Sequence, residues 1–227
     1  MKSKIKKLFL KTYGCQMNVF DSERIEESLI NFGIKKVYEE QNSDLIILNT
    51  CHIREKAAEK VYSELGRIRK LKQKNPKLKI GVIGCVAQAE GQEIIERSKI
   101  VDMVLGPQVY HKLPEIISKI ESNEKVVDTD FPLEDKFEKL NLTKKDKRNS
   151  TAFLTIQEGC DKFCSFCVVP YTRGAERSRS PEVIIKEAKE LVNSGVKEIT
   201  LLGQNVNSYN GLNEKNKSID FTSLIKI

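Results

Sequence analysis

Three cysteines lie within eight residues in the second half of the chain, at Cys160, Cys164 and Cys167, here called the loop cysteines. A cubane 4Fe–4S cluster normally takes four protein thiolates, so three leave one iron with an open coordination position. The amino and carboxylate groups of S-adenosylmethionine form a chelate that can occupy it. Electron transfer can then cleave the sulfonium and release a 5′-deoxyadenosyl radical. The spacing therefore predicts a catalytic cluster that binds S-adenosylmethionine.

A zinc site is the alternative for the loop cysteines. Zinc needs a fourth ligand, and only His52, His111 or a distant cysteine remain to supply it. The C-x3-C-x2-C spacing also differs from the cysteine runs of ferredoxins. The motif directly follows a predicted strand, at the face where βα barrels keep their active sites. These features favour the iron–sulfur cluster.

A second set, Cys15, Cys51 and Cys85, has no motif spacing, since its members lie 36 and 34 residues apart. Each of these strand-end cysteines follows an apolar stretch, in LFLKTYGC, LIILNTC and IGVIGC. The carboxyl ends of parallel strands share one sheet edge, where ligands bind, so the three could converge there. Three buried structural cysteines are the alternative, because a free cysteine packs as a small apolar residue. The residues alone leave both interpretations open.

Strand and helix patterns alternate through the first half of the chain. Short apolar runs predict strands at 7–12, 45–48, 80–83 and 101–105. Helical spacing predicts helices from 21, from 57 to 75, and at 92–97 and 113–120. For the first helix, Asp21 is the predicted cap, Ile25, Leu29 and Phe32 form the apolar face, and Gly33 is the stop. The pattern predicts an α/β domain with a doubly wound, largely parallel sheet over residues 1–122.

Residues 123–150 carry mixed charge and little periodicity, which predicts an interdomain linker. Its basic run at 144–148 is either a solvated surface or a strip that contacts phosphate. A second unit over 151–227 has a strand at 152–156, a helix that begins at Ser180-Pro181 and ends at Gly195, and a strand at 199–202. This order is typical of the first part of a βα barrel. A complete barrel needs ~200 residues or more, so we expect a fragment or a truncated gene product.

Composition indicates a soluble protein with an anionic partner. Lys and Arg number 39 against 32 Asp and Glu, a net charge of +7 that favours nucleic acid. No apolar stretch approaches the length of a membrane span, and the N-terminal apolar run is too short for a signal peptide. We therefore expect a cytoplasmic location, where six cysteines more often serve metal or redox chemistry than disulfides.

Six ordered stretches resemble the radical S-adenosylmethionine methylthiotransferases. They are TYGCQMN at 12–18, NTCHIREKA at 49–57, GCVAQ at 84–88, EGCDKFCSFC at 158–167, VVPYTRG at 168–174 and LLGQNVN at 201–207. The resemblance covers nearly the whole chain, from Leu8 to Tyr209. Within the family, the first two stretches are most similar to the branch that modifies isopentenylated tRNA. The resemblance implies a complete barrel and a C-terminal RNA-binding domain in the family, and we expect neither within these 227 residues.

The resemblance implies two 4Fe–4S clusters: an auxiliary cluster on the strand-end cysteines, and one on the loop cysteines that cleaves S-adenosylmethionine. It implies methylthiolation of C2 of N6-isopentenyladenosine next to the anticodon, with sulfur inserted at the auxiliary cluster. The expected partners are tRNA and an electron-donor protein, with no membrane, and the expected state is a monomer. The alternatives are action on threonylcarbamoyl-adenosine tRNA or a ribosomal protein, and a non-catalytic, cluster-containing RNA-binding fragment.

The resemblance also suggests residues around the cofactor. Phe166 is expected to pack beside the adenine of S-adenosylmethionine, or else within its own loop. Gly203, Gln204 and Asn205 end the last predicted strand and are expected to line the cofactor pocket, although Gln and Asn there also satisfy turns.

Charged residues near the loop complete the candidate set. Ala175 stands where the family often has an acidic residue, so a cofactor-binding role is assigned to Glu176 instead. Arg173, Arg177 and Arg179 cluster near the motif and either contact RNA phosphate or are solvated.

Overall fold

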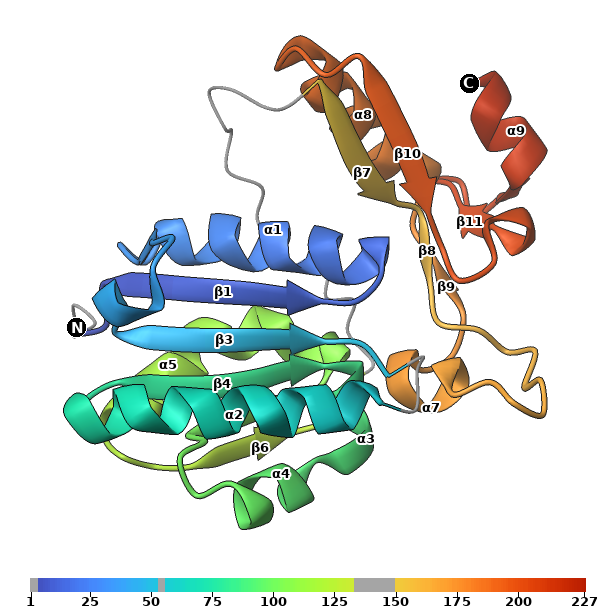
Figure 1. The fold of residues 1–227 in the computed structure, drawn as a ribbon. Coiled ribbons are helices and arrows are strands. Elements are labelled where there is room, and N and C mark those ends of the chain that lie inside the picture. The colour runs from blue at the N-terminus through green and yellow to red at the C-terminus, as the bar shows by residue number, and fades with distance from the viewer. Residues whose placement is uncertain (1–3, 53–55, 133–149) are drawn as a thin grey trace. The chain divides into compact units, whose positions relative to one another are not determined.

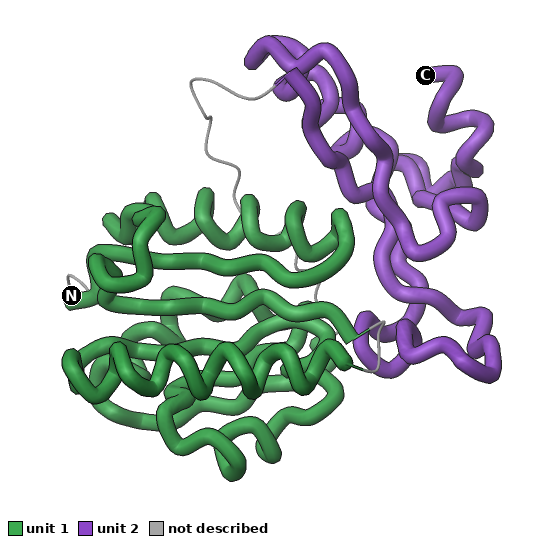
Figure 2. The backbone as a smooth tube through the Cα atoms, in the orientation of Figure 1, with its two compact units in different colours: residues 1–143 green, residues 144–227 purple. Residues whose placement is uncertain are grey.

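The structure, a computed structural model, describes residues 4–52, 56–132 and 150–227. The chain divides into two compact units, residues 1–143 and residues 144–227, which Figure 2 distinguishes by colour. The first unit carries the strand-end cysteines and the second carries the loop cysteines. Each unit is described by itself.

The first unit is built on a six-stranded sheet in which every neighbouring pair of strands is parallel. Its strands are β1 (Lys7–Tyr13), β2 (Lys35–Lys36), β3 (Leu45–Thr50), β4 (Lys79–Gly84), β5 (Met103–Leu105) and β6 (Val126–Asp128). The spatial order is β2-β1-β3-β4-β5-β6, and in Figure 1 the arrows β1, β3 and β4 lie side by side and point the same way. The predicted parallel α/β sheet is confirmed.

Helices cover both faces of the sheet because its central strands are buried on both sides. The helices are α1 (Gln16–Ile30), α2 (Ala57–Lys74), α3 (Cys85–Glu90), α4 (Gln92–Arg97) and α5 (Leu113–Glu121), with short 3-10 turns η1 (Glu40–Asn42) and η2 (Pro107–Lys112). Ile46 and Leu48 pack with residues of α2, α3 and α4. Leu45 and Ile47 point to the opposite face and pack with residues of α1 and α5. The sheet is therefore doubly wound.

The first helix begins before the predicted cap. Its N-cap is Cys15, and Asp21 lies inside the helix with 3% of its surface exposed, so the assignment of Asp21 as the cap is wrong. Met17 and Phe20 are buried and extend the apolar face toward the N-terminus. Phe32 lies beyond the helix and is half exposed, so it does not belong to the apolar face. The extra turn places Cys15 at the amino end of a helix.

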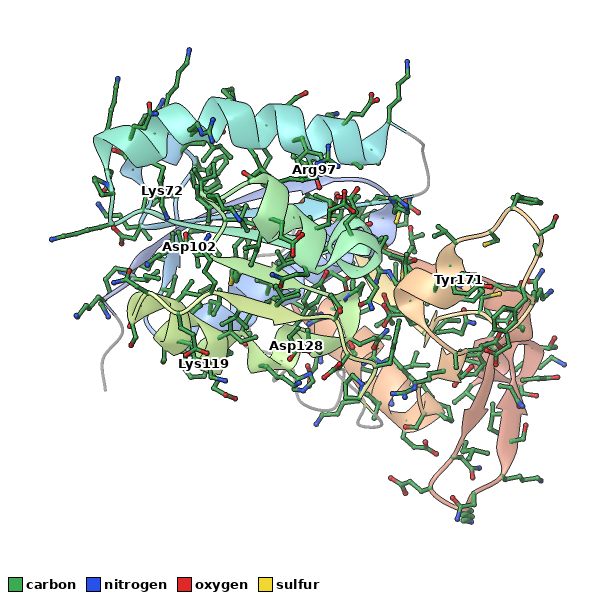
Figure 3. The ribbon with its side chains drawn as sticks, turned by 90° about the horizontal axis from the view of Figure 1, so that it is seen from below. Lys72, Arg97, Asp102, Lys119, Asp128 and Tyr171 are labelled. Atoms are coloured by element: carbon green, nitrogen blue, oxygen red, sulfur yellow. The ribbon has the colours of Figure 1, made fainter. Side chains whose placement is uncertain are left out.

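The sheet extends into the segment predicted as a linker, so the predicted linker start at 123 is wrong. The strand β6 pairs with β5, and the Lys112 ammonium holds it through an ion pair of 2.8 Å to Asp128, labelled in Figure 3. Three half-buried residues among charged neighbours show no clear apolar period, which explains why the sequence did not indicate this strand. The basic run at 144–148 lies outside the described residues.

The second unit contains the predicted strand–helix–strand order. Its strands β7 (Thr151–Thr155) and β10 (Glu198–Leu202) pair in parallel, and α8 (Pro181–Asn193) connects them along the chain. The Ser180 hydroxyl caps α8 by accepting a hydrogen bond of 3.3 Å from the backbone N–H of Val183, as the sequence predicts. This arrangement is consistent with the first part of a radical S-adenosylmethionine barrel.

Shorter elements make up the rest of the second unit. They are β8 (Gln157–Glu158), α7 (Val169–Arg173), β9 (Arg177–Ser178), η3 (Val206–Ser208), β11 (Asn210–Leu212), β12 (Ser218–Asp220) and α9 (Phe221–Lys226). β8 pairs with β9, and β11 with β12, both antiparallel. Across the parts of the chain that the structure describes, no helix combines the length and apolar character needed to cross a membrane.

An ion-pair cluster on the first unit yields a test of the fold. Burial raises the pKa of the Glu64 carboxyl, but hydrogen bonds from Arg67 and Lys11 outweigh it and lower the pKa to about 2. Because the folded pKa lies below the unfolded value, this stabilisation is fully present above the unfolded pKa and is lost as the pH falls toward 2. We expect Glu64→Gln to cost ~1–2 kcal/mol at pH 7 and progressively less below pH 4.5, measured by urea unfolding at each pH.

The matched control is Glu93→Gln. The Glu93–Arg97 pair is exposed at both ends, and exposed pairs contribute little to the free energy of unfolding. An equal, pH-independent loss of stability in both variants would contradict the role assigned to Glu64.

Candidate metal centres

The register of three neighbouring strands brings the strand-end cysteines to one edge of the sheet. Tyr13 of β1 lies opposite Thr50 of β3, and Thr50 lies opposite Gly84 of β4. These three residues end their strands, and Cys51 and Cys85 follow immediately, while Cys15 follows after one glycine. Figure 1 shows the three strands ending on the same side of the sheet. Residues far apart in the sequence thus meet at the edge where parallel sheets bind ligands.

Two glycines allow the chain segments at this edge to approach closely. A Cβ atom on Gly14 would lie 2.5 Å from the Cβ of Cys51. A Cβ atom on Gly84, whose φ is +96°, would lie 2.3 Å from the carbonyl oxygen of Thr50. Any larger residue would therefore push apart the segments that carry Cys15, Cys51 and Cys85, so the two glycines keep the edge compact.

A buried network of polar side chains fixes the same edge. The Asn18 amide donates hydrogen bonds of 2.9 Å to Asn49 Oδ1 and 3.2 Å to the carbonyl oxygen of Thr50. Asn49 in turn donates to the Asn18 carbonyl oxygen and to Ser22 Oγ, both at 2.9 Å. Both asparagine side chains are fully buried, so each lost partner would leave an unsatisfied polar group. The network joins the beginning of α1 to the end of β3.

Cys15 contacts this network directly. Its thiol donates a hydrogen bond of 3.2 Å to Asn18 Oδ1, and its carbonyl oxygen accepts from the backbone N–H groups of Asn18 and Val19. Cys15 therefore lies at the amino end of the long helix α1, whose positive partial charge favours an anionic ligand. The sequence analysis did not identify Asn18 or Asn49. Asn49 is a polar residue that directly follows four apolar residues of a buried strand, which was the available signal.

A cavity of about 420 Å³ opens beside two of the strand-end cysteines. Its lining residues come from β1, the turn after it, the end of β3 and the start of α2: Tyr13, Gly14, Cys15, Thr50, Cys51, Lys56, Ala57, Lys60 and Val61. Cys85 is buried, with 6% of its surface exposed. Within residues 4–52, 56–132 and 150–227, no three Cys, His, Asp or Glu side chains already stand in a metal-binding arrangement. The thiol donors and the compact edge fit a three-cysteine cluster once the side chains turn toward one another.

The loop cysteines lie in an accessible loop of the second unit. Cys164 is exposed, Cys160 and Cys167 are half-buried, and all three are free thiols. The backbone N–H of Cys167 donates a hydrogen bond of 2.9 Å to the carbonyl oxygen of Cys164, which folds the C-x2-C segment into a turn. Phe163 has a φ of +45°, a conformation that costs a non-glycine residue ~1–3 kcal/mol. The loop thus presents three cysteine sulfurs, which are the donors that iron–sulfur clusters take.

Two glutamines hold the start of this loop. Gln204 Oε1 accepts a hydrogen bond of 2.8 Å from the backbone N–H of Gly159. The fully buried Gln157 donates to the Gly159 carbonyl oxygen at 3.1 Å and accepts from the Asn205 N–H at 3.2 Å. A Cβ atom on Gly203 would lie 2.7 Å from Gln157 Oε1. Gly203, Gln204 and Asn205 therefore lie beside the beginning of the cysteine loop, and Gln157 is a residue that the sequence analysis missed.

The remaining candidates around the loop are placed as follows. Phe166 is 92% exposed, so it does not pack within its own loop, and its contact with the adenine remains a prediction. Glu176 accepts a hydrogen bond of 2.9 Å from the Ser208 hydroxyl. Tyr171, labelled in Figure 3, packs edge-to-face against Phe163 with ring centroids 6.1 Å apart.

Two of the candidate arginines are buried, which corrects the expectation that they contact phosphate or solvent. Arg173 is 3% exposed and forms an ion pair with Glu158. Arg179 is 7% exposed and forms an ion pair of 2.7 Å with Glu187. Arg177 is half-buried in β9. A run of basic residues in the sequence predicts a cationic surface. In the structure, however, carboxylates from other elements pair with Arg173 and Arg179 and allow them to be buried.

Comparison with known proteins matches the two units to two different family models. The model named "Uncharacterized protein family UPF0004" matches residues 7–106, and that of the radical SAM superfamily matches residues 154–221. A protein from Ruegeria pomeroyi named tRNA-2-methylthio-N(6)-dimethylallyladenosine synthase is 66% identical over 206 residues, which are 91% of this chain and 47% of the relative. A protein of the same name from Bartonella tribocorum is 57% identical over 219 residues, 94% of this chain and 48% of the relative.

Over more than nine-tenths of its length the chain is similar to proteins of this name, and its second unit matches the radical SAM superfamily. The chain spans about half the length of the curated relatives that it matches. A solved structure of the radical S-adenosylmethionine methyltransferase TsrM from Kitasatospora setae has the same fold, with a TM-score of 0.57 over 89% of this chain and 48% of that chain. The sequence identity to TsrM is 12%, so this likeness concerns the fold alone.

The close approach at Gly84 yields a prediction about the stability of the first unit. We expect Gly84→Ala to destabilise the first unit by ~3–5 kcal/mol, because the new methyl group adds a clash with the Thr50 backbone to the cost of the left-handed conformation. The control is Gly33→Ala, where φ is +76° but no atom lies within 4 Å, and where only ~1–2 kcal/mol is expected. Urea unfolding measures both, and equal losses would contradict the close approach.

Proposed function

We propose that this chain carries the cluster-binding part of an enzyme that methylthiolates C2 of N6-isopentenyladenosine next to the anticodon of tRNA. The observation that carries the proposal is the register of β1, β3 and β4, which ends three strands side by side with a cysteine after each. The names of relatives that are 57% and 66% identical over more than nine-tenths of the chain support the substrate.

In this proposal the two cysteine sets hold two different 4Fe–4S clusters. The strand-end cysteines hold the auxiliary cluster, at which sulfur is inserted, and the loop cysteines hold the cluster that binds S-adenosylmethionine. When bound, such a three-cysteine cluster supplies an open iron position and an electron for cleaving the sulfonium. The thiol of Cys15 at the amino end of α1 and the close approach at Gly14 suit the binding of an anionic, compact group.

The residues around the loop cysteines fix the start of the loop and leave its surface accessible to a large substrate. Gln157 and Gln204 hold the backbone of Gly159, and therefore the position at which the loop begins. Cys164 and Phe166 are exposed, which leaves the site open to an RNA loop whose target base is unstacked. The net charge of +7 favours the tRNA partner. We further propose a cytoplasmic, monomeric protein that receives electrons from a donor protein.

A second candidate is a fragment that binds clusters and RNA without turnover. The chain spans about half of the length of each relative. Two further alternatives are methylthiolation of threonylcarbamoyl-adenosine tRNA and of a ribosomal protein. They differ from the proposed function only in the substrate.

Iron analysis tests the two-cluster proposal. After anaerobic reconstitution with iron and sulfide, we expect about eight irons per chain, because two cubane clusters hold four each. The triple variants C15A/C51A/C85A and C160A/C164A/C167A are each expected to keep about four. A single zinc and no iron per chain would sink the proposal, and so would a simultaneous loss of both clusters in either triple variant.

The division of labour between the two sites gives a second test. With an isopentenylated anticodon stem-loop as substrate, we expect Cys15→Ala to continue forming 5′-deoxyadenosine while losing all methylthiolated product. Cys164→Ala is the matched comparison, and it is expected to abolish both. Mass spectrometry of the RNA and chromatography of the nucleoside give the two readouts. Loss of 5′-deoxyadenosine in Cys15→Ala would contradict the assignment.

A further inference from the structure

A buried ion pair joins the two ends of the segment that contains all three loop cysteines. Glu158 precedes the first of them by two residues, and Arg173 closes α7 after the last. Arg173 Nη1 lies 2.5 Å from Glu158 Oε1, and the two side chains are only 2% and 3% exposed. The charges are therefore almost completely removed from water.

Further contacts close the same base of the loop. The backbone N–H of Cys160 donates a hydrogen bond of 3.1 Å to the Gly174 carbonyl oxygen. Asp161 Oδ1 accepts from the Glu176 N–H at 3.0 Å, and a Cβ atom on Gly159 would lie 2.0 Å from the Ala175 carbonyl oxygen. The chain entering the loop and the chain leaving it thus run in direct contact, with the ion pair at the centre of the closure.

Stability alone is a poor explanation for this pair. Removing two charges from water costs several kcal/mol per ion, and a well-packed apolar pair is often as stable or more so. A buried pair does provide a defined arrangement, since the planar guanidinium donates hydrogen bonds to a carboxylate in only a few orientations. The arrangement fixed here is that of the loop ends, and hence of the backbone from which the three thiols project.

We infer that Glu158 and Arg173 are positioning residues that hold the ends of the cysteine loop together, so that the loop backbone is closed before iron arrives and the three thiols have only to turn toward one another. This inference rests on the proposed function and extends it to two residues that touch neither cluster nor substrate. Their effect acts through the backbone of Cys160. Outer contacts of this kind typically change metal affinity ~10–100-fold when they are removed.

The second unit contains a matched control for this inference. Arg179 and Glu187 form another buried ion pair, 2.7 Å long, with side chains 6% and 4% exposed. This pair joins the end of β9 to α8, and the segment between its members contains no cysteine. Its loss should therefore cost stability of the unit without affecting the cysteine loop.

The experiment compares Arg173→Met with Arg179→Met in a C15A/C51A/C85A background, where only the loop cluster contributes iron. We expect R173M to lose iron to a chelator ~10–100-fold faster than its parent, and R179M to keep the parental rate. In the iron-free chain, the Cys160 amide should exchange with deuterium at least ~10-fold faster in R173M and at the parental rate in R179M. Thermal unfolding records how much each substitution destabilises the unit.

Glu158→Gln serves as the conservative variant, because it keeps the size of the side chain and one hydrogen bond to Arg173. It is expected to fold and to show the same two effects as R173M, reduced in size. Parental iron retention and amide exchange in both E158Q and R173M would overturn the inference. Equal effects in R173M and R179M would overturn it as well, because the pair would then serve only the stability of the unit.

Failure of the proposed function itself gives a different result. In that case the background parent takes up no iron–sulfur cluster, with or without the R173M substitution, and the amide-exchange difference carries no consequence for metal binding. If the parent and the R173M variant both load the cluster and keep it equally well, the result contradicts the role of the ion pair in loop closure. The proposed function then still stands.

Discussion

The backbone ladder that joins β1, β3 and β4 in register is the constraint on which the first unit depends. Parallel pairing sets Tyr13 beside Thr50 and Thr50 beside Gly84, so the chain leaves all three strands at the same level. A shift of one residue would move a cysteine along the edge and turn the apolar side chains of β3 to the wrong faces. Burial of β3 on both sides makes that shift costly, and the core thereby fixes the position of the cysteines.

In the second unit, a different kind of constraint positions the three cysteines. Its three cysteines are neighbours in sequence, so the protein has only to shape one loop. Glutamine side chains, a buried ion pair and a close glycine contact do this at the base of the loop. In the first unit the ordering comes from long-range strand pairing, whereas in the second it comes from side chains that reach the backbone of a local segment.

The sequence predicted the elements whose signals are local. The all-apolar runs of β3 and β4 indicated buried parallel strands, and Ser180-Pro181 marked the start of α8, because each pattern reflects a short-range physical requirement. The strand β6 was missed, since three half-buried residues carry no period. The sequence predicts a start of α1 at Asp21 because aspartate is a favoured capping residue, whereas the helix begins earlier and tertiary packing buries Asn18 against Asn49 of β3.

In the candidate site, too, the sequence predicted some residues and missed others. The cysteines were found from their types and positions, but the residues that hold them were not, because their role is visible only once distant segments meet. Arg173 and Arg179 show this most clearly. In sequence they belong to a basic cluster, and only the fold reveals the carboxylates of Glu158 and Glu187 that draw them into the interior.

The different origins of the two cysteine arrangements also set how each depends on folding. The strand-end thiols become neighbours only when β1, β3 and β4 have paired, so a metal bound there recognises the folded unit and not the unfolded chain. A ligand with that preference stabilises the folded state by mass action. The loop thiols stay close even in an unfolded chain. Iron supply would therefore be coupled to the global folding equilibrium of the first unit, and far more weakly to that of the second.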